Sequence, residues 1–274
     1  MKKLRYMLLI PILVTLYALW KLCRFWFKPT GGNEGWIAET QPSEPWQYWT
    51  DVFWKVFFTL YNGLEIQNAH YIPQDKNASF VTVANHESIL DGFIMGLSVM
   101  RPLYIMVKKE AFEVPIKGFY LRKVLCYPVD RSKTDSTAIK TAFKYLSEGK
   151  CLGIFPEGTR NRKGFVSEFK PGAIKLAIKK KIPILPAYIA NSHNITPIDC
   201  ILPRPAKLKV IFLEPIDTKA ELEAGKNEKD IIEMLYKRIT DVGTQTMGYD
   251  VRDPEYLKRL EQQSQAPIGV ESGK

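Results

Sequence analysis

Short apolar runs alternate with stretches of helical periodicity from about residue 78 to residue 246. A short apolar run between turn-forming residues is typical of a buried strand, whereas apolar positions three or four apart predict a helix. The predicted strands span 79–84, 104–107, 124–129, 151–155, 184–189 and 208–213. The predicted helices span 88–99, 115–122, 135–147, 171–180 and 228–246. This alternation predicts an α/β domain, with a mixed, largely parallel sheet flanked by helices.

Two strongly apolar segments precede this domain. The first, MLLIPILVTLYALW at 7–20, has basic residues on both sides and no small-residue cleavage site after it, so it fits a signal peptide poorly. As a helix, its 14 residues would rise about 21 Å, less than the ~30 Å hydrocarbon core of a bilayer. The second, WQYWTDVFWKVFFTLY at 46–61, is rich in Trp and Tyr, which favour the membrane–water boundary.

All six tryptophans fall within the first 54 residues, a segregation that a soluble core does not require. We therefore expect residues 1–66 to form a membrane-anchoring helical hairpin that dips into, or just crosses, one leaflet. The alternative is a buried helical pair inside a soluble protein. We expect residues 67–252 to form the α/β domain, and the polar residues 253–274 to be a flexible tail.

The charge of the chain is uneven. The formal net charge is +10, and 19 Lys or Arg against 7 Asp or Glu give the stretch 101–190 a net charge of +12. Such a field favours a phosphate-rich partner: nucleic acid, anionic lipid or a nucleotide-bearing cofactor. The four cysteines form no CxxC or Cys/His cluster, so neither a disulfide framework nor a zinc site is indicated.

The stretch NHESILD at 85–91 follows the first predicted strand, where α/β sheets tend to bind ligands. Asp91 can reach back from the first turns of a helix to one nitrogen of His86, leaving the other nitrogen to take a proton from a hydroxyl. Ser88 lacks the GxSxG setting of a nucleophile and is expected to cap the helix or line the site. A purely structural His–Asp hydrogen bond is the alternative, and a metal site would need a third ligand.

The stretch FPEGTRNRKG at 155–164 follows another predicted strand. Gly158 permits a tight turn or a close approach to a ligand, and the guanidinium of Arg160 suits a phosphate. Glu157 could orient that arginine or accept a hydrogen bond from a ligand hydroxyl. The stretch is not a Walker A loop, because GxxxxGK[ST] is absent, and an ordinary turn remains the alternative.

Taken together, these motifs resemble the glycerolipid acyltransferase family, specifically the 1-acyl-glycerol-3-phosphate acyltransferases. NHxSxxD is met by residues 85–91, and FPEGTR is matched letter for letter by residues 155–160. The segment 108–131 resembles a second block of that family, with Lys109, Pro115, Gly118 and Arg131 in its places. IPILPAYI at 182–189 and FKPGA at 169–173 also fit, so the resemblance covers roughly residues 80–190.

The resemblance implies that His86 is a general base oriented by Asp91, and that the acceptor is lysophosphatidic acid. The donor would be the thioester of acyl-CoA or acyl-carrier protein, with no cofactor, no metal and no acyl-enzyme. The substrate-binding residues implied are Asn85, Ser88, Lys109, Arg131, Glu157, Gly158, Thr159 and Arg160. Because thioester donors are cytosolic, the catalytic domain would lie on the cytoplasmic face of a phospholipid membrane.

Three alternatives remain open from the sequence. The first is an acyltransferase of the same fold for another acceptor, such as a lysophospholipid or glycerol 3-phosphate. The second is a catalytically inactive, membrane-bound lipid-binding protein, against which the intact pair of His86 and Asp91 argues. The third is a nucleic-acid-binding module, for which no recognition signature is present, so no nucleic-acid partner is expected.

Overall fold

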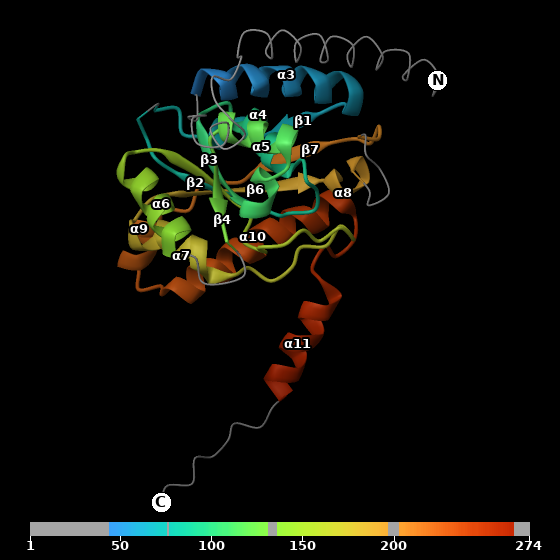
Figure 1. Cartoon of the computed structure of the whole chain (residues 1–274). Helices are drawn as coiled ribbons and strands as arrows, with labels where there is room; N and C mark the ends of the chain where they lie inside the picture. The colour runs from blue at the N-terminus through green and yellow to red at the C-terminus, as the bar shows by residue number, and fades with distance from the viewer. Residues whose placement is uncertain (1–43, 76, 131–135, 197–202, 266–274) are drawn as a thin grey trace, which may run out of the picture.

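The computed structural model describes residues 44–75, 77–130, 136–196 and 203–265. Within these residues a seven-stranded sheet is covered by helices on both faces (Figure 1). The first arm of the expected hairpin, 7–20, and the expected site residue Arg131 lie outside the described residues.

The strand order is β1-β7-β6-β2-β5-β3-β4. All neighbouring strands pair in parallel except β6 and β7, which are antiparallel. The strands are β1 (Glu65–Gln67), β2 (Val81–Ala84), β3 (Leu103–Lys108), β4 (Cys126–Val129), β5 (Cys151–Ile154), β6 (Ile184–Ala190) and β7 (Lys209–Phe212). The mixed, largely parallel sheet predicted from the sequence is confirmed, and β1 is a short edge strand that the pattern did not indicate.

The α-helices confirm the predicted helical segments and add others. They are α3 (Glu44–Asn62), α4 (Asp91–Val99), α5 (Pro115–Lys123), α6 (Ser136–Ser147), α7 (Pro171–Lys179), α8 (Ser192–Ile195), α9 (Thr218–Glu223), α10 (Glu228–Met247) and α11 (Pro254–Gln265). Short 3₁₀ turns occur at η1 (Ala69–Tyr71) and η2 (Lys109–Phe112). A capping box at Asn227 begins α10, and Gly248 in the left-handed region ends it.

The central strands are buried on both faces, which explains their continuous apolar sequence. In β6, Leu185, Ala187 and Ile189 face one core, and Ile184, Tyr188 and Ala190 face the other. Helices α3 and α4 cover the first core, whereas α6, α7 and α10 cover the second (Figure 1). The result is a three-layer sandwich whose middle layer ends in the loops that carry the motifs.

Helix α3 forms the second apolar segment of the expected hairpin and lies across the outside of the α4 layer (Figure 1). Its inner side buries Phe57 and Phe58, while Trp49 and Leu60 are exposed on the other side. No helix among the described residues is both long and apolar enough to cross a bilayer. The hairpin and its contact with a membrane therefore stay a prediction.

The expected tail at 253–274 begins instead with helix α11, which extends away from the body of the domain (Figure 1). The sequence analysis did not predict this helix, because the segment is mostly polar and has only a few apolar residues, Tyr256, Leu257 and Leu260. Asp253 stabilises its start by accepting a hydrogen bond from the Glu255 amide at 2.9 Å, and Pro254 suits a first helical position. Asp253 also accepts hydrogen bonds from Asn161 and Ser167, which ties the helix start to the loop after β5.

Candidate active site

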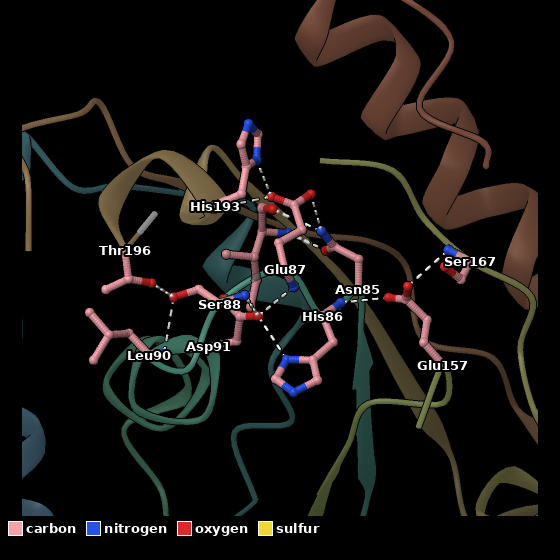
Figure 2. Close-up of polar contacts among 11 residues, drawn as sticks. Asn85, His86, Glu87, Ser88, Leu90, Asp91, Glu157, Ser167, His193 and Thr196 are labelled. Atoms are coloured by element: carbon pink, nitrogen blue, oxygen red, sulfur yellow. Dashed lines mark hydrogen bonds and ion pairs between the residues drawn. The ribbon is translucent and has the colours of Figure 1, made fainter. Parts of the chain in front are cut away.

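The two sequence motifs meet where neighbouring parallel strands end. NHESILD follows β2 and FPEGTR follows β5, and these strands pair directly, with Val83 opposite Ile154. Strand β6, on the other side of β2, leads into α8. Because the carboxyl ends of parallel strands lie at one edge, the loops after β5 and β6 both contact the loop that carries His86 (Figure 2).

Asp91 orients the imidazole of His86. Nδ1 of His86 lies 2.8 Å from Oδ2 of Asp91, and the same oxygen accepts hydrogen bonds from the amides of Glu87 and Ser88 at 2.7 Å (Figure 2). Asp91 is fully buried in the first turn of α4, where the helix dipole favours a negative charge. An ionised carboxylate can only accept a hydrogen bond, so beside it a neutral imidazole carries its proton on Nδ1 and keeps the lone pair of Nε2. The pair is therefore arranged for His86 to act as a base through Nε2.

A stacking contact with Phe155 also fixes the ring of His86. The two rings have 4.4 Å between their centroids and 22° between their planes. Only 15% of the His86 side chain is exposed. Phe155 is the first residue of FPEGTR, so this contact joins the two motifs directly.

The carboxyl group of Glu157 fixes the backbone at His86. Its Oε1 accepts a hydrogen bond from the amide of His86 at 2.6 Å, and its Oε2 accepts one from the amide of Ser167 at 2.8 Å (Figure 2). Burial raises the pKa of Glu157 well above its usual range, although the donors from Ser167 and His86 act in the opposite direction. Glu157 thus joins the two loops, and its oxygens face backbone amides.

Asn85 and Ser88 are buried behind the histidine. The amide group of Asn85 bonds both backbone groups of Ile189 in β6, and also donates to Oε1 of Glu87 at 2.9 Å. The hydroxyl of Ser88 lies 2.5 Å from that of Thr196 and accepts a hydrogen bond from the amide of Leu90. Both side chains therefore anchor the loop to its neighbours. The contact of Ser88 with the Leu90 amide lies just before α4, whose N-cap, Leu90, makes no side-chain hydrogen bond.

Several cationic side chains border the same edge of the sheet. Arg160 is exposed after β5, next to the polar Thr159, and Lys109 is exposed after β3. The backbone of Gly158 has φ +72, a conformation that glycine adopts readily, and a Cβ there would lie 3.2 Å from the Lys170 side chain. Burial and the nearby charge of Arg160 lower the pKa of Lys117 in α5. This positive edge suits a phosphate-bearing ligand.

The chain is similar to known acyltransferases. The family model described as Acyltransferase matches residues 63–190. The chain is 30% identical over 191 residues to the 1-acyl-sn-glycerol-3-phosphate acyltransferase of Bacillus subtilis strain 168, covering 69% of this chain and 92% of that protein. The corresponding protein of Saccharomyces cerevisiae is 35% identical over 176 residues, covering 60% of this chain and 56% of that protein.

The chain belongs to the 1-acyl-sn-glycerol-3-phosphate acyltransferase family. It is an O-acyltransferase. The crystal structure of the LPA acyltransferase PlsC from Thermotoga maritima shares the fold, with a TM-score of 0.65, 22% identity, and coverage of 89% of this chain and 94% of that one. The resemblance drawn from the motifs is thereby confirmed.

At this candidate site, the structure brings together most of the residues expected from the sequence. His86, Asp91, Asn85, Ser88 and Glu157 form one hydrogen-bonded group around the end of β2. The others that the structure describes, Lys109, Gly158, Thr159 and Arg160, follow β3 and β5 at the same edge of the sheet.

The sequence analysis missed the contribution of the loop after β6. His193 lies with Nδ1 2.7 Å from Oε2 of Glu87, and Thr196 contacts Ser88. The rarity of histidine in the chain was the available signal, because His193 is one of only three. Among the described residues, no group of three or more His, Cys, Asp or Glu side chains is arranged to hold a metal ion.

Proposed function

We propose that this enzyme transfers an acyl group from a thioester donor to the sn-2 hydroxyl of 1-acyl-glycerol-3-phosphate, giving phosphatidic acid. The observation that carries the proposal is the pair of His86 and Asp91, 2.8 Å apart, beside the FPEGTR loop. This chain matches 92% of the length of the Bacillus subtilis protein and 56% of the length of the Saccharomyces cerevisiae protein. Both proteins carry this activity in their names, which supports the choice of acceptor.

In the proposed reaction, Nε2 of His86 takes the proton of the sn-2 hydroxyl as its oxygen attacks the thioester carbonyl. The C–O bond forms, the C–S bond breaks, and the imidazolium returns the proton to the leaving thiolate. Asp91 keeps the proton on Nδ1 and stabilises the imidazolium between these steps. A thioester is already activated, so orientation of the hydroxyl and one general base can supply much of the acceleration. This path uses no acyl-enzyme, metal or cofactor.

The acceptor phosphate is proposed to bind at the positive edge around Gly158 and Arg160. The planar guanidinium of Arg160 can donate two hydrogen bonds to one phosphate, and the cationic side chain of Lys170 lies beside Gly158, 3.2 Å from where a Cβ would stand. Lys109 and Arg131 are proposed as further cations for phosphate groups. Glu157, whose oxygens accept from backbone amides, would hold this loop in position without touching the phosphate.

The enzyme is proposed to work at a membrane, with its catalytic domain on the cytoplasmic side. The exposed apolar side chains of α3, among them Trp49 and Leu60, suit contact with lipid. Basic residues near the surface are attracted to an acidic leaflet by about 1 kcal/mol each. Both acyl-CoA and acyl-carrier protein suit the chemistry, because the reacting bond is the same thioester.

A transferase for another phosphate-bearing acceptor is the second candidate, because the positive edge would suit a lysophospholipid or glycerol 3-phosphate equally. The test offers the detergent-purified enzyme equal concentrations of 1-acyl-glycerol-3-phosphate, lysophosphatidylcholine and glycerol 3-phosphate, with a labelled long-chain acyl-CoA. Labelled phosphatidic acid should dominate the products. Preferential labelling of either other acceptor would overturn the proposed acceptor, and repeating the assay with acyl-carrier protein identifies the donor.

A further inference from the structure

A second histidine–carboxylate pair lies immediately behind the first. Oε2 of Glu87 is 2.7 Å from Nδ1 of His193, and the amide of His193 points to the same oxygen at 3.4 Å. Figure 2 shows His193 on the side of Glu87 opposite to the ring of His86. The second pair therefore supports the loop from behind, away from the base nitrogen.

Glu87 connects this pair to the catalytic loop on both sides. It is the residue after His86, and its amide donates to Oδ2 of Asp91 at 2.7 Å. Its other oxygen, Oε1, accepts from Asn85, which is itself bonded to Ile189 at the end of β6. A shift of the Glu87 side chain would consequently move the backbone from which both members of the catalytic pair are oriented.

His193 is held in place by its surroundings. A Cβ added at Gly164 would lie 2.6 Å from Cε1 of the His193 ring, so the loop after β5 packs closely against it. Thr196, three residues further on, contacts Ser88. The segment 191–196 thus touches two successive residues of NHESILD and the loop that follows FPEGTR.

The charges around Glu87 explain why it needs a partner. Glu87, Asp91 and Glu157 are all buried, and Tyr188 and Tyr249 also lie close enough to interact electrostatically with Glu87. Burial raises the pKa of Glu87 and the charge of Asp91 raises it further, while the hydrogen bond and charge of His193 lower it. His193 therefore favours the ionised form of Glu87, which is the form that accepts hydrogen bonds from both Asn85 and His193.

We propose that His193 is a positioning residue for acyl transfer, acting through Glu87 to hold the backbone that orients His86 and Asp91. The inference rests on the proposed function of His86 as the base. His193 itself touches neither substrate nor reacting atoms, so its loss should lower kcat and leave the Michaelis constant for the acceptor nearly unchanged.

The test compares His193→Phe, Glu87→Gln and the double variant with the wild type. Phenylalanine keeps a ring against Gly164 but removes the hydrogen bond, and His70→Phe makes the same change at an exposed histidine as a matched control. Each single variant should lose about tenfold to a hundredfold in kcat, with KM for 1-acyl-glycerol-3-phosphate changed less than about threefold. The double variant should lose no more than the more impaired single variant, because the two residues act as one unit.

A second readout does not depend on the acceptor. In protein labelled with ¹⁵N-histidine, the imidazole signal of His86 should change in His193→Phe and Glu87→Gln but not in His70→Phe. Wild-type kcat in both single variants, or losses that multiply in the double variant, would overturn the positioning role. So would an unchanged His86 signal. If the wild type acylates no acceptor while the His86 signal still responds, the proposed function fails and the coupling stands.

Discussion

The amide of His86 donates a hydrogen bond to Oε1 of Glu157 at 2.6 Å, across 71 residues of sequence. The glutamate of FPEGTR thereby fixes the backbone of NHESILD, while its other oxygen fixes Ser167. The sequence suggests separate functions for the two motifs, a base and a phosphate-binding loop. In the structure, Glu157 links their backbones directly. A substitution in FPEGTR should therefore alter the position of NHESILD, and a substitution in NHESILD should alter the position of FPEGTR.

Glu157→Gln tests this link. A glutamine offers one oxygen and one NH₂ group, so either His86 or Ser167 would have its amide facing a donor. We expect a loss of about 1–3 kcal/mol in the free energy of unfolding and a decrease in kcat of about tenfold to a hundredfold. Denaturant titration and steady-state kinetics measure the two effects. Glu168→Gln, at an exposed neighbouring glutamate, is the matched control, and equal behaviour of the two variants would contradict the link.

Asp91→Asn should impair the chemical step. Oδ2 of Asp91 accepts from Nδ1 of His86 and from two amides, and an asparagine there neither stabilises an imidazolium nor specifies the tautomer. We expect kcat to fall by about a thousandfold or more, with acceptor binding retained. Single-turnover kinetics measure the chemical step, and a lipid-binding assay measures acceptor binding. Asp75→Asn, at an exposed position, is the control. A variant with wild-type kcat would show that the pair is only structural.

Arg160→Ala should weaken acceptor binding more than it slows the chemistry. A charge-assisted hydrogen bond is worth about 1.5–3 kcal/mol, so KM for the acceptor should rise by roughly tenfold to a hundredfold. Arg160→Lys should recover only part of this, because an ammonium lacks the planar fork of a guanidinium. Arg162→Ala, two residues further along the same loop, is the control. An unchanged KM would place the phosphate elsewhere.

Stability should depend on pH through Asp51, which is buried in α3 against Gly96 of α4. Burial raises the pKa of Asp51 from 3.8 to about 7. Because the folded state holds this proton more tightly than the unfolded state, stability should fall as the pH rises from about 4 to about 7. The full difference corresponds to about 4 kcal/mol.

Asp51→Asn should remove this dependence. The variant should be more stable than the wild type at pH 8 and differ little from it at pH 4, as measured by denaturant unfolding across the range. Asp75→Asn, exposed to solvent, should follow the wild type. A variant that is less stable than the wild type at pH 8 would mean that the ionised carboxylate has a stabilising partner.

The fold was largely predictable because its strands are buried on both faces. Runs such as ILPAYI admit few alternatives to a central strand, and the structure places β6 there with alternate side chains in the two cores. Strand β1, with three residues at the edge, and the polar helix α11 carry no such signal. Asp253 caps the start of α11 and is also hydrogen-bonded to Asn161 in a loop far away in the sequence. That long-range contact is visible only in the tertiary structure.

The candidate site was predictable where one motif supplies both partners. His86 and Asp91 lie five residues apart, so a helix start is enough to bring them together. Glu157 was expected to face a ligand or an arginine, and its contact with the amide of His86 depends on how β2 and β5 pair. The contact of Glu87 with His193 spans 106 residues and depends on β6 ending beside β2, which spacing in the sequence does not reveal.

The most direct test of the central claim compares wild type and His86→Ala in acyl transfer from a labelled long-chain acyl-CoA to 1-acyl-glycerol-3-phosphate. A general base typically contributes about 10²–10⁴-fold, so wild type should form phosphatidic acid and the variant should lose at least that factor while still binding the acceptor. His70→Ala, at the exposed histidine, should react at the wild-type rate. Full activity in His86→Ala would contradict the mechanism, and no phosphatidic acid from the wild type would contradict the acceptor.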